Sequence, residues 1–107
     1  MLNQRIATKI IKEYIDECKK RNIFFQKVIL FGSIVSGRIH EYSDIDLALV
    51  SDQFNDDRYE DRHLLSPINI HYTDIEPHTY STKYFEEGDP FIEEIKKTGI
   101  EIDLKKL

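Results

Sequence analysis

Apolar residues recur at every third or fourth position near the start of the chain, with charged residues between them. The apolar positions are Ile6, Ile10, Ile11, Tyr14, Ile15 and Cys18. This spacing gathers apolar side chains on one face of an α-helix. We expect the helix to end at Asn22 and Cys18 to belong to the core.

Four later segments have the patterns of β-strands. Residues 27–31 are a continuous run of branched and aromatic residues after one lysine, which is typical of a buried strand. Residues 44–50 alternate acidic and apolar positions in their first half. A third strand is predicted over 68–76, stopped by Pro77, and a short last strand over 100–104.

More polar segments connect these strands. They are predicted as a short helix at 34–37, a loop at 38–43, a charged loop at 51–62 that leads into a short helix ending near Leu65, and an irregular stretch at 78–89. Pro90 begins a final helix with Phe91, Ile92 and Ile95 on one face, and Gly99 ends it. Strands that alternate with helices in this way predict an α+β domain, a small mixed sheet with helices packed on it.

The length of 107 residues corresponds to one domain, which we assign to residues 1–107. A hydrophobic fraction of 40% with six Phe and six Tyr supplies one core and argues against disorder. One cysteine excludes a disulfide framework and a cysteine zinc site. The longest uncharged apolar run is too short to cross a membrane, and the first residues lack the apolar core of a signal peptide. These features predict a cytoplasmic protein.

The net charge of −5 argues against binding to duplex DNA, which requires a basic surface. An acidic chain can still bind phosphate when its carboxylates hold a divalent cation that in turn holds the phosphate.

Two sequence features are suited to such an arrangement. Gly32 and Ser33 follow the first predicted strand and precede a helical turn, where backbone N–H groups and a hydroxyl can bind phosphate. Asp44 and Asp46 are two positions apart on the second strand, so both carboxylates point the same way and could bridge divalent cations. Either feature alone is common. This combination at this spacing is expected by chance in roughly one chain of this length in a thousand.

Later acidic residues could complete the ligand set. Asp74 and Glu76 share one face of the third predicted strand, and Tyr72 lies on the same face, so the strand register decides which of them reaches the cations. We favour Asp74, with Glu76 as the alternative. Carboxylate oxygens are the donors that Mg²⁺ and Mn²⁺ prefer.

The segment 32–47, Gly-Ser-Ile-Val-Ser-Gly-Arg-Ile-His-Glu-Tyr-Ser-Asp-Ile-Asp-Leu, resembles the signature of the DNA polymerase beta nucleotidyltransferase superfamily. Within it, the chain is most similar to the small stand-alone minimal nucleotidyltransferases of bacteria and archaea. The similarity in length and element order covers nearly the whole chain.

The resemblance implies a role for each matching residue. Gly32 and Ser33 would hold the β- and γ-phosphates of ATP or another nucleoside triphosphate. Asp44 and Asp46 would ligate two Mg²⁺ ions, with Mn²⁺ as an alternative, and Asp74 would be the third catalytic carboxylate. The reaction would transfer a nucleoside monophosphate, AMP when ATP is the donor, to an acceptor hydroxyl and release pyrophosphate.

The resemblance also implies a protein partner. Small members of this family pair with a helical HEPN-domain toxin, and the nucleotidyltransferase, acting as antitoxin, modifies a tyrosine of that toxin. The alternative is a catalytically weak or inactive antitoxin that neutralises its partner by binding alone. The acceptor, the base preference and the formation of homo-oligomers stay open at this point.

Overall fold

The structure is a computed structural model that describes residues 3–37 and 44–106. Its elements, in chain order, are α1 (Gln4–Lys20), β1 (Lys27–Phe31), α2 (Ser33–Ser36), β2 (Ile45–Ser51), α3 (Arg58–Asn69), β3 (Ile75–Ser81), α4 (Thr82–Glu87), α5 (Pro90–Thr98), β4 (Ile100–Glu101) and a 3₁₀ turn, η1 (Leu104–Lys106). The loop expected at 38–43 lies outside the described residues. None of the helices in the described part is long and apolar enough to span a membrane.

The four strands form one mixed sheet in the order β3-β2-β1-β4. Strand β1 runs antiparallel to both β2 and β4, whereas β2 and β3 are parallel. Strand β2 is therefore paired along both sides, and β3 lies at an edge. The predicted α+β class, a small mixed sheet with helices packed on it, is confirmed.

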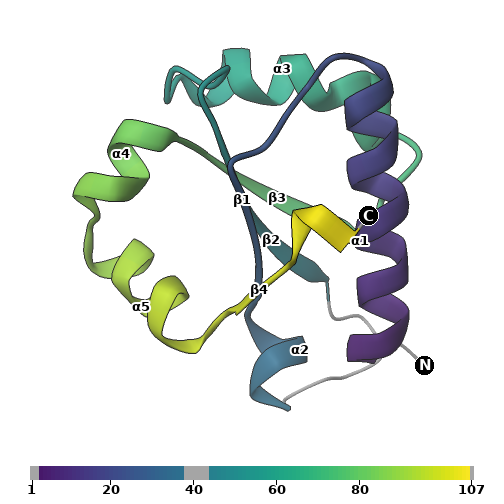
Figure 1. Ribbon diagram of the computed structural model, residues 1–107, viewed down its shortest axis with the longest axis vertical. Coiled ribbons are helices and arrows are strands. Elements are labelled where there is room, and N and C mark those ends of the chain that lie inside the picture. Colours follow the sequence, from purple (N-terminus) through teal and green to yellow (C-terminus); the bar gives the residue numbers. More distant parts are fainter. Residues whose placement is uncertain (1–2, 38–43, 107) are drawn as a thin grey trace.

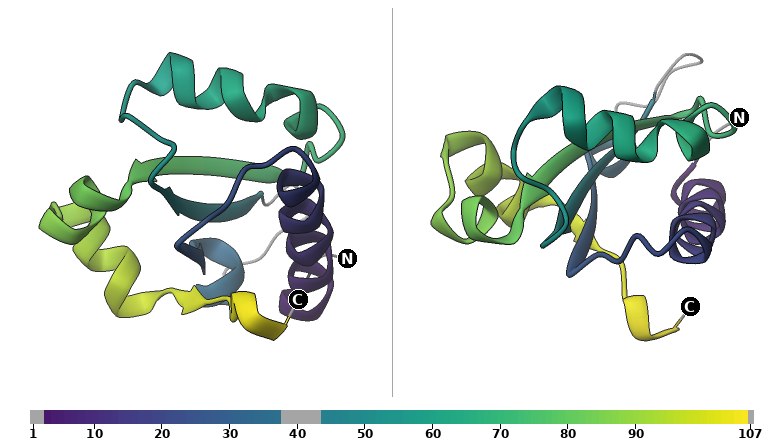
Figure 2. Two further views of the ribbon diagram at one scale, coloured as in Figure 1. Left: turned by 45° about the horizontal axis from the view of Figure 1, so that its top comes forward. Right: turned by 90° about the horizontal axis from the view of Figure 1, so that it is seen from above.

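Helices cover both faces of the sheet (Figure 1). On the first face, α1 and α3 pack on alternate residues of the strands, which include Val28, Leu30, Ile45, Leu47, Leu49 and Ile75. On the second face, α4 and α5 pack on the intervening residues, which include Ile29, Phe31, Ala48 and Val50. Figure 2 shows α1 and the pair α4–α5 on opposite sides of the strands in both views. The strands are thus largely buried on both faces, which explains their nearly continuous apolar sequences.

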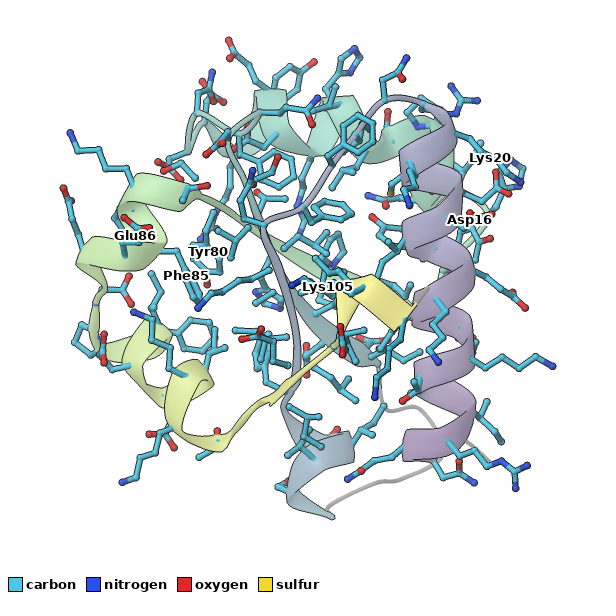
Figure 3. All side chains as sticks on the ribbon, viewed as in Figure 1. Asp16, Lys20, Tyr80, Phe85, Glu86 and Lys105 are labelled. Atoms are coloured by element: carbon cyan, nitrogen blue, oxygen red, sulfur yellow. The ribbon has the colours of Figure 1, made fainter. Side chains whose placement is uncertain are left out.

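The first helix has the extent and orientation that its apolar spacing predicts. Asn3 caps its start by accepting a hydrogen bond from the backbone N–H of Ile6, and Cys18 is buried in the core as expected. Asp16 and Lys20 form an exposed ion pair, 3.4 Å between Oδ2 and Nζ, on its outer side (Figure 3).

The third strand is wrongly placed by the sequence pattern. Residues 68 and 69 end α3, and β3 begins only at Ile75 and continues through Pro77 to Ser81. A proline is tolerated within β3 because this strand lies at the edge of the sheet and pairs on one side only. Helix α4 follows it. Most of the segment 78–89 therefore has regular secondary structure, whereas the sequence pattern predicted an irregular stretch.

Helix α3 is also longer than predicted, since it begins at Arg58 within the charged segment. Asp57 caps its first turn by accepting hydrogen bonds from the N–H groups of Tyr59 and Glu60. Buried Asp61 accepts two more from the N–H groups of Asn55 and Asp56. The acidic side chains of this segment therefore satisfy backbone donors, as N-terminal acids do.

The last strand is shorter than predicted, because β4 comprises only Ile100–Glu101 before the 3₁₀ turn. Helix α5 begins at Pro90 and ends before Gly99 as predicted. Beside it, Tyr80 of β3 and Phe85 of α4 pack together on the second face, with ring centroids 5.6 Å apart (Figure 3). Aromatic residues thus contribute to the core of the second face together with aliphatic residues such as Ile92 and Ile95.

Candidate active site

A tight turn joins β1 to α2. Gly32 adopts φ 82° and ψ −151°, a conformation that L side chains rarely adopt, and its carbonyl accepts hydrogen bonds from the N–H groups of Val35 and Ser36 at 3.1 Å. Ser33 is the first residue of α2, and Gly37 ends the helix in a left-handed conformation. The predicted strand–turn–helix junction is therefore present, with Gly32 and Ser33 at its start.

The carboxylate of Asp46 lies directly against this turn. In the antiparallel pairing of β1 with β2, Asp46 faces Phe31, the residue before Gly32. A β-carbon added at Gly32 would overlap Oδ2 of Asp46. Glycine is therefore required at this position both by its φ angle and by the carboxylate beside it.

Glu76 is the neighbour of Asp46 on the other side. The parallel register of β2 and β3 pairs Asp46 with Glu76, so their side chains emerge on the same face of the sheet. One oxygen of Glu76 lies 3.6 Å from the Arg62 guanidinium of α3. Glu76 thus lies beside the site with its carboxylate close to a cation.

The other two predicted carboxylates lie at the ends of strands. Asp44 is exposed immediately before β2 and is close enough to influence the charge of Asp46. Asp74 is exposed in the turn before β3, and its backbone carbonyl accepts a hydrogen bond of 2.7 Å from the N–H of Ile45. The register therefore brings Glu76, rather than Asp74, directly beside Asp46.

The environment of Asp46 disfavours its negative charge. Burial raises the pKa of its carboxyl above the ordinary value, and the charges of Glu76 and Asp44 raise it further, whereas the nearby His78 lowers it. The net shift is upward. A carboxylate that is partly buried among other carboxylates gains more from a bound cation than an exposed one does.

A histidine lies beside this carboxylate and two phenylalanine rings pack against the histidine; none of the three was recognised as a site residue from the sequence. His78 Nε2 lies 3.4 Å from Asp46 Oδ1. The His78 ring packs against Phe31 with centroids 5.0 Å apart and against Phe91 at 6.1 Å. Phe91 stays half-exposed, although it was expected on the apolar face of α5 with Ile92 and Ile95. The sequence does contain a signal for His78, because it follows Glu76 by two positions. Once the strand is located correctly, this spacing places both side chains on the same face of the sheet.

A groove of ≈ 680 Å³ begins at the turn and runs between α2 and α5. Its polar lining residues come from the turn and α2 and from α5, and are Gly32, Ser33, Ser36, Glu94 and Thr98. Phe31, Phe91 and Ile95 are among its apolar lining residues. A small molecule that binds the turn through phosphates would therefore extend along a partly apolar surface.

The donor set fits a hard divalent cation by its chemistry, because Asp44, Asp46 and Glu76 supply carboxylate oxygens on one side of the sheet. Within residues 3–37 and 44–106, no three His, Cys, Asp or Glu side chains converge as they would around an ion. The side chain of Glu76, close to Arg62, would have to turn toward Asp46 to complete such a set.

Comparisons with known proteins give a consistent picture. The family model described as "Nucleotidyltransferase domain" matches residues 11–106. The fold resembles the crystal structure of a "putative nucleotidyltransferase" from Sulfolobus solfataricus, with a TM-score of 0.65, 17% identity, and coverage of 89% of this chain and 78% of that one. It also resembles a chain in the crystal structure of a toxin–antitoxin with AMP-PNP, with a TM-score of 0.54, 21% identity, and coverage of 88% and 70%. No curated protein matches the sequence.

Proposed function

Because the chain belongs to the nucleotidyltransferase domain family, we propose that it transfers a nucleoside monophosphate from a nucleoside triphosphate, ATP in the first instance, to an acceptor hydroxyl. The observation that supports this most directly is the contact between the Gly32 turn and the carboxylate of Asp46. It brings a phosphate-binding type of turn and a cation-binding type of carboxylate within one small site.

In this proposal, the β- and γ-phosphates bind at Gly32 and Ser33, and the nucleoside occupies part of the adjoining groove. Backbone N–H groups at the start of α2 and the Ser33 hydroxyl donate hydrogen bonds to phosphate oxygens. The half-exposed ring of Phe91 gives the groove an apolar wall beside this position.

Asp44 and Asp46, together with a third carboxylate, would hold divalent cations, Mg²⁺ or Mn²⁺. Such cations would supply positive charge to the phosphates and make the acceptor hydroxyl more acidic. The acceptor oxygen forms a bond to the α-phosphorus, the bond from that phosphorus to the β-phosphate oxygen breaks, and pyrophosphate leaves. The hydroxyl proton passes to solvent or to a nearby carboxylate, so no covalent enzyme intermediate is needed.

We propose Glu76 as the third carboxylate. Its pairing with Asp46 across β2 and β3 supports it over Asp74, which precedes the strand. The guanidinium of Arg62 competes for Glu76 in the structure, so Glu76 would exchange this partner for the cation.

A protein is the acceptor that we favour. The structural neighbour from a toxin–antitoxin crystal supports a partner protein for this chain. We propose a helical HEPN-type toxin with an acceptor tyrosine. The second candidate function is neutralisation of such a partner by binding alone, and it is supported by the absence of three convergent ligand side chains in the described residues.

Calorimetric titration with ATP and Mg²⁺ tests the proposed site. We expect the intact protein to bind ATP in a Mg²⁺-dependent manner and the Asp44→Ala/Asp46→Ala variant to lose this binding. The matched control is Glu86→Ala/Glu87→Ala on the exposed side of α4, which changes the net charge equally and should bind as the intact protein does. Equal ATP binding by both double variants would refute the assignment of the site.

The acceptor is tested by mass spectrometry. Incubation with ATP, Mg²⁺ and a HEPN-type partner should add one AMP to a partner tyrosine, and the addition should disappear with Asp46→Asn. A stable complex with an unmodified partner, despite demonstrated ATP binding, would instead favour neutralisation by binding.

A further inference from the structure

We propose that His78 is a further protein ligand of the cation held by Asp46, and that its nitrogen makes the site prefer Mn²⁺ to Mg²⁺. The inference rests on the proposed function, because it concerns the same cation site. Neither the family match nor the structural neighbours assign a role to this histidine.

The distance between the two side chains suits donors that share an ion. His78 Nε2 is 3.4 Å from Asp46 Oδ1, which is long for an N–H···O hydrogen bond, whose usual length is about 2.9 Å. Metal–ligand bonds of about 2.1 Å place adjacent donors of one ion about 3.0 Å apart in octahedral geometry and about 3.4 Å apart in tetrahedral geometry. Mg²⁺ and Mn²⁺ take octahedral geometry, so one of these ions would fit between the two atoms once they approach each other by about 0.4 Å.

The strand geometry directs His78 to the same site. His78 follows Glu76 by two residues on β3, so both side chains emerge on the face where Asp46 lies. The residue of β2 that pairs with His78 is Ala48, whose small side chain leaves room beside the imidazole. Asp46, Glu76 and His78 thus emerge on one face of two adjacent strands, and in the described residues only Asp46 and His78 already lie close together, since Glu76 is near Arg62.

Two aromatic rings hold the imidazole in place. Phe31 meets it edge-on with an interplanar angle of 63°, and the Phe91 ring is tilted by 47° from it with its centroid 6.1 Å away. The side chains of His78 and Asp46 are each 28% exposed, so a cation can reach both from solvent. Packing of this kind fixes the orientation of a ligand side chain before the ion binds. The entropic cost of ordering that side chain on binding is therefore lower.

A nitrogen ligand changes which metal is preferred. Mg²⁺ is a hard ion that takes oxygen ligands. Mn²⁺ also favours oxygen ligands, but as a first-row transition metal it gains more from one imidazole nitrogen than Mg²⁺ does. A site with carboxylates and one imidazole should therefore bind Mn²⁺ more tightly than a site with carboxylates alone. The alternative is that His78 only orients Asp46 by a hydrogen bond, in which case no nitrogen contacts the ion.

Titration of the full chain with Mn²⁺, without nucleotide, separates these cases. Pulsed electron paramagnetic resonance of bound Mn²⁺ detects a directly bonded imidazole through its coupling to ¹⁴N. We expect this coupling in the intact protein and in the control His71→Gln, an exposed histidine in the turn before β3. We expect its loss in His78→Gln, together with a rise in the Mn²⁺ dissociation constant on the order of 10- to 100-fold and little change for Mg²⁺.

The outcomes are distinguishable. Mn²⁺ that binds and is lost with Asp46→Asn, but shows no ¹⁴N coupling, overturns the role of His78 and leaves the proposed function intact. Failure of the intact protein to bind Mn²⁺ or Mg²⁺, with or without ATP, overturns both. The ¹⁴N signal of the intact protein requires no variant, so the proposal is decided even if His78→Gln does not fold.

Discussion

Gly32 and Asp46 are in contact across β1 and β2, with the carboxylate occupying the space that a side chain at Gly32 would fill. The turn that we propose to bind phosphate and the carboxylate that we propose to bind the cation are thus positioned by one another. A change at either residue should therefore affect both the stability and the ligand binding of the site.

Gly32→Ala should be more destabilising than Gly37→Ala. Both glycines have positive φ angles, 82° and 79°, but a β-carbon at Gly37 would meet nothing within 4 Å. The backbone cost is about 1–2 kcal/mol at Gly37, which lies in the left-handed αL region with ψ 10°. It is larger at Gly32, whose ψ of −151° places it in a region essentially confined to glycine, and the overlap with Asp46 adds to it there. Urea unfolding measures the difference, and Mg²⁺-dependent ATP binding should be lost only in Gly32→Ala. Equal losses of stability in Gly32→Ala and Gly37→Ala would contradict the close contact between Gly32 and Asp46.

Asp46→Asn should stabilise the metal-free protein at neutral pH. Burial raises the pKa of Asp46 in the folded state, so the stability that this carboxyl gives is present below its unfolded pKa of about 4 and is lost as pH rises through the folded pKa. The variant avoids that loss. With EDTA present, its advantage should be smallest near pH 4 and should grow as pH rises through the folded pKa of Asp46. Glu87→Gln on α4 is the control, and an advantage independent of pH would contradict the prediction.

Cys18→Ala should remove part of the alkaline destabilisation of the protein. Burial raises the pKa of the Cys18 thiol to about 12, whereas the unfolded chain ionises near pH 8.5. The folded state therefore keeps its proton where the unfolded state loses it, and the free energy of unfolding falls by up to about 1.4 kcal/mol per pH unit above pH 8.5. Urea unfolding at pH 8 and pH 10 should show a smaller fall for Cys18→Ala. Identical falls would show that the thiol ionises readily in the folded protein.

Tyr14→Phe should destabilise the contact between α1 and α3. The buried Tyr14 hydroxyl donates a hydrogen bond of 2.6 Å to Asn69 Oδ1, and its removal leaves that acceptor without this donor. The expected loss is about 1–3 kcal/mol in urea unfolding. Tyr59→Phe, which removes a hydroxyl from a tyrosine that is 80% exposed, should have almost no effect. ATP binding should survive in both variants, because neither residue adjoins the site.

The first helix and the first two strands could be predicted from local sequence patterns. Periodic apolar residues define α1, and continuous apolar runs define β1 and β2, because these strands are buried on both faces. The turn at Gly32 and the carboxylate at Asp46 follow directly from the ends of those strands. Their place in one site was implied by the family resemblance, whereas their direct contact depends on the antiparallel pairing of β1 with β2, which local patterns do not specify.

The third strand could not be located in the same way. Its residues become a strand by pairing with β2, which is a long-range contact, and its position at the sheet edge tolerates Pro77. Local patterns could not decide between Asp74 and Glu76, because that choice depends on register. His78 was missed for the same reason, since its place beside Asp46 exists only once β3 is located.

The central position of β2 has a consequence for the persistence of the site. The amide protons of β2 lie between two partner strands, whereas β4 pairs with β1 through only two residues. Under native conditions, hydrogen exchange should be fast at β4 and slowest along β2, where exchange requires unfolding of the whole domain. The fraying of the C-terminal segment therefore leaves Asp46 and its two neighbouring strands assembled, and the chemistry of the site does not depend on that edge staying closed.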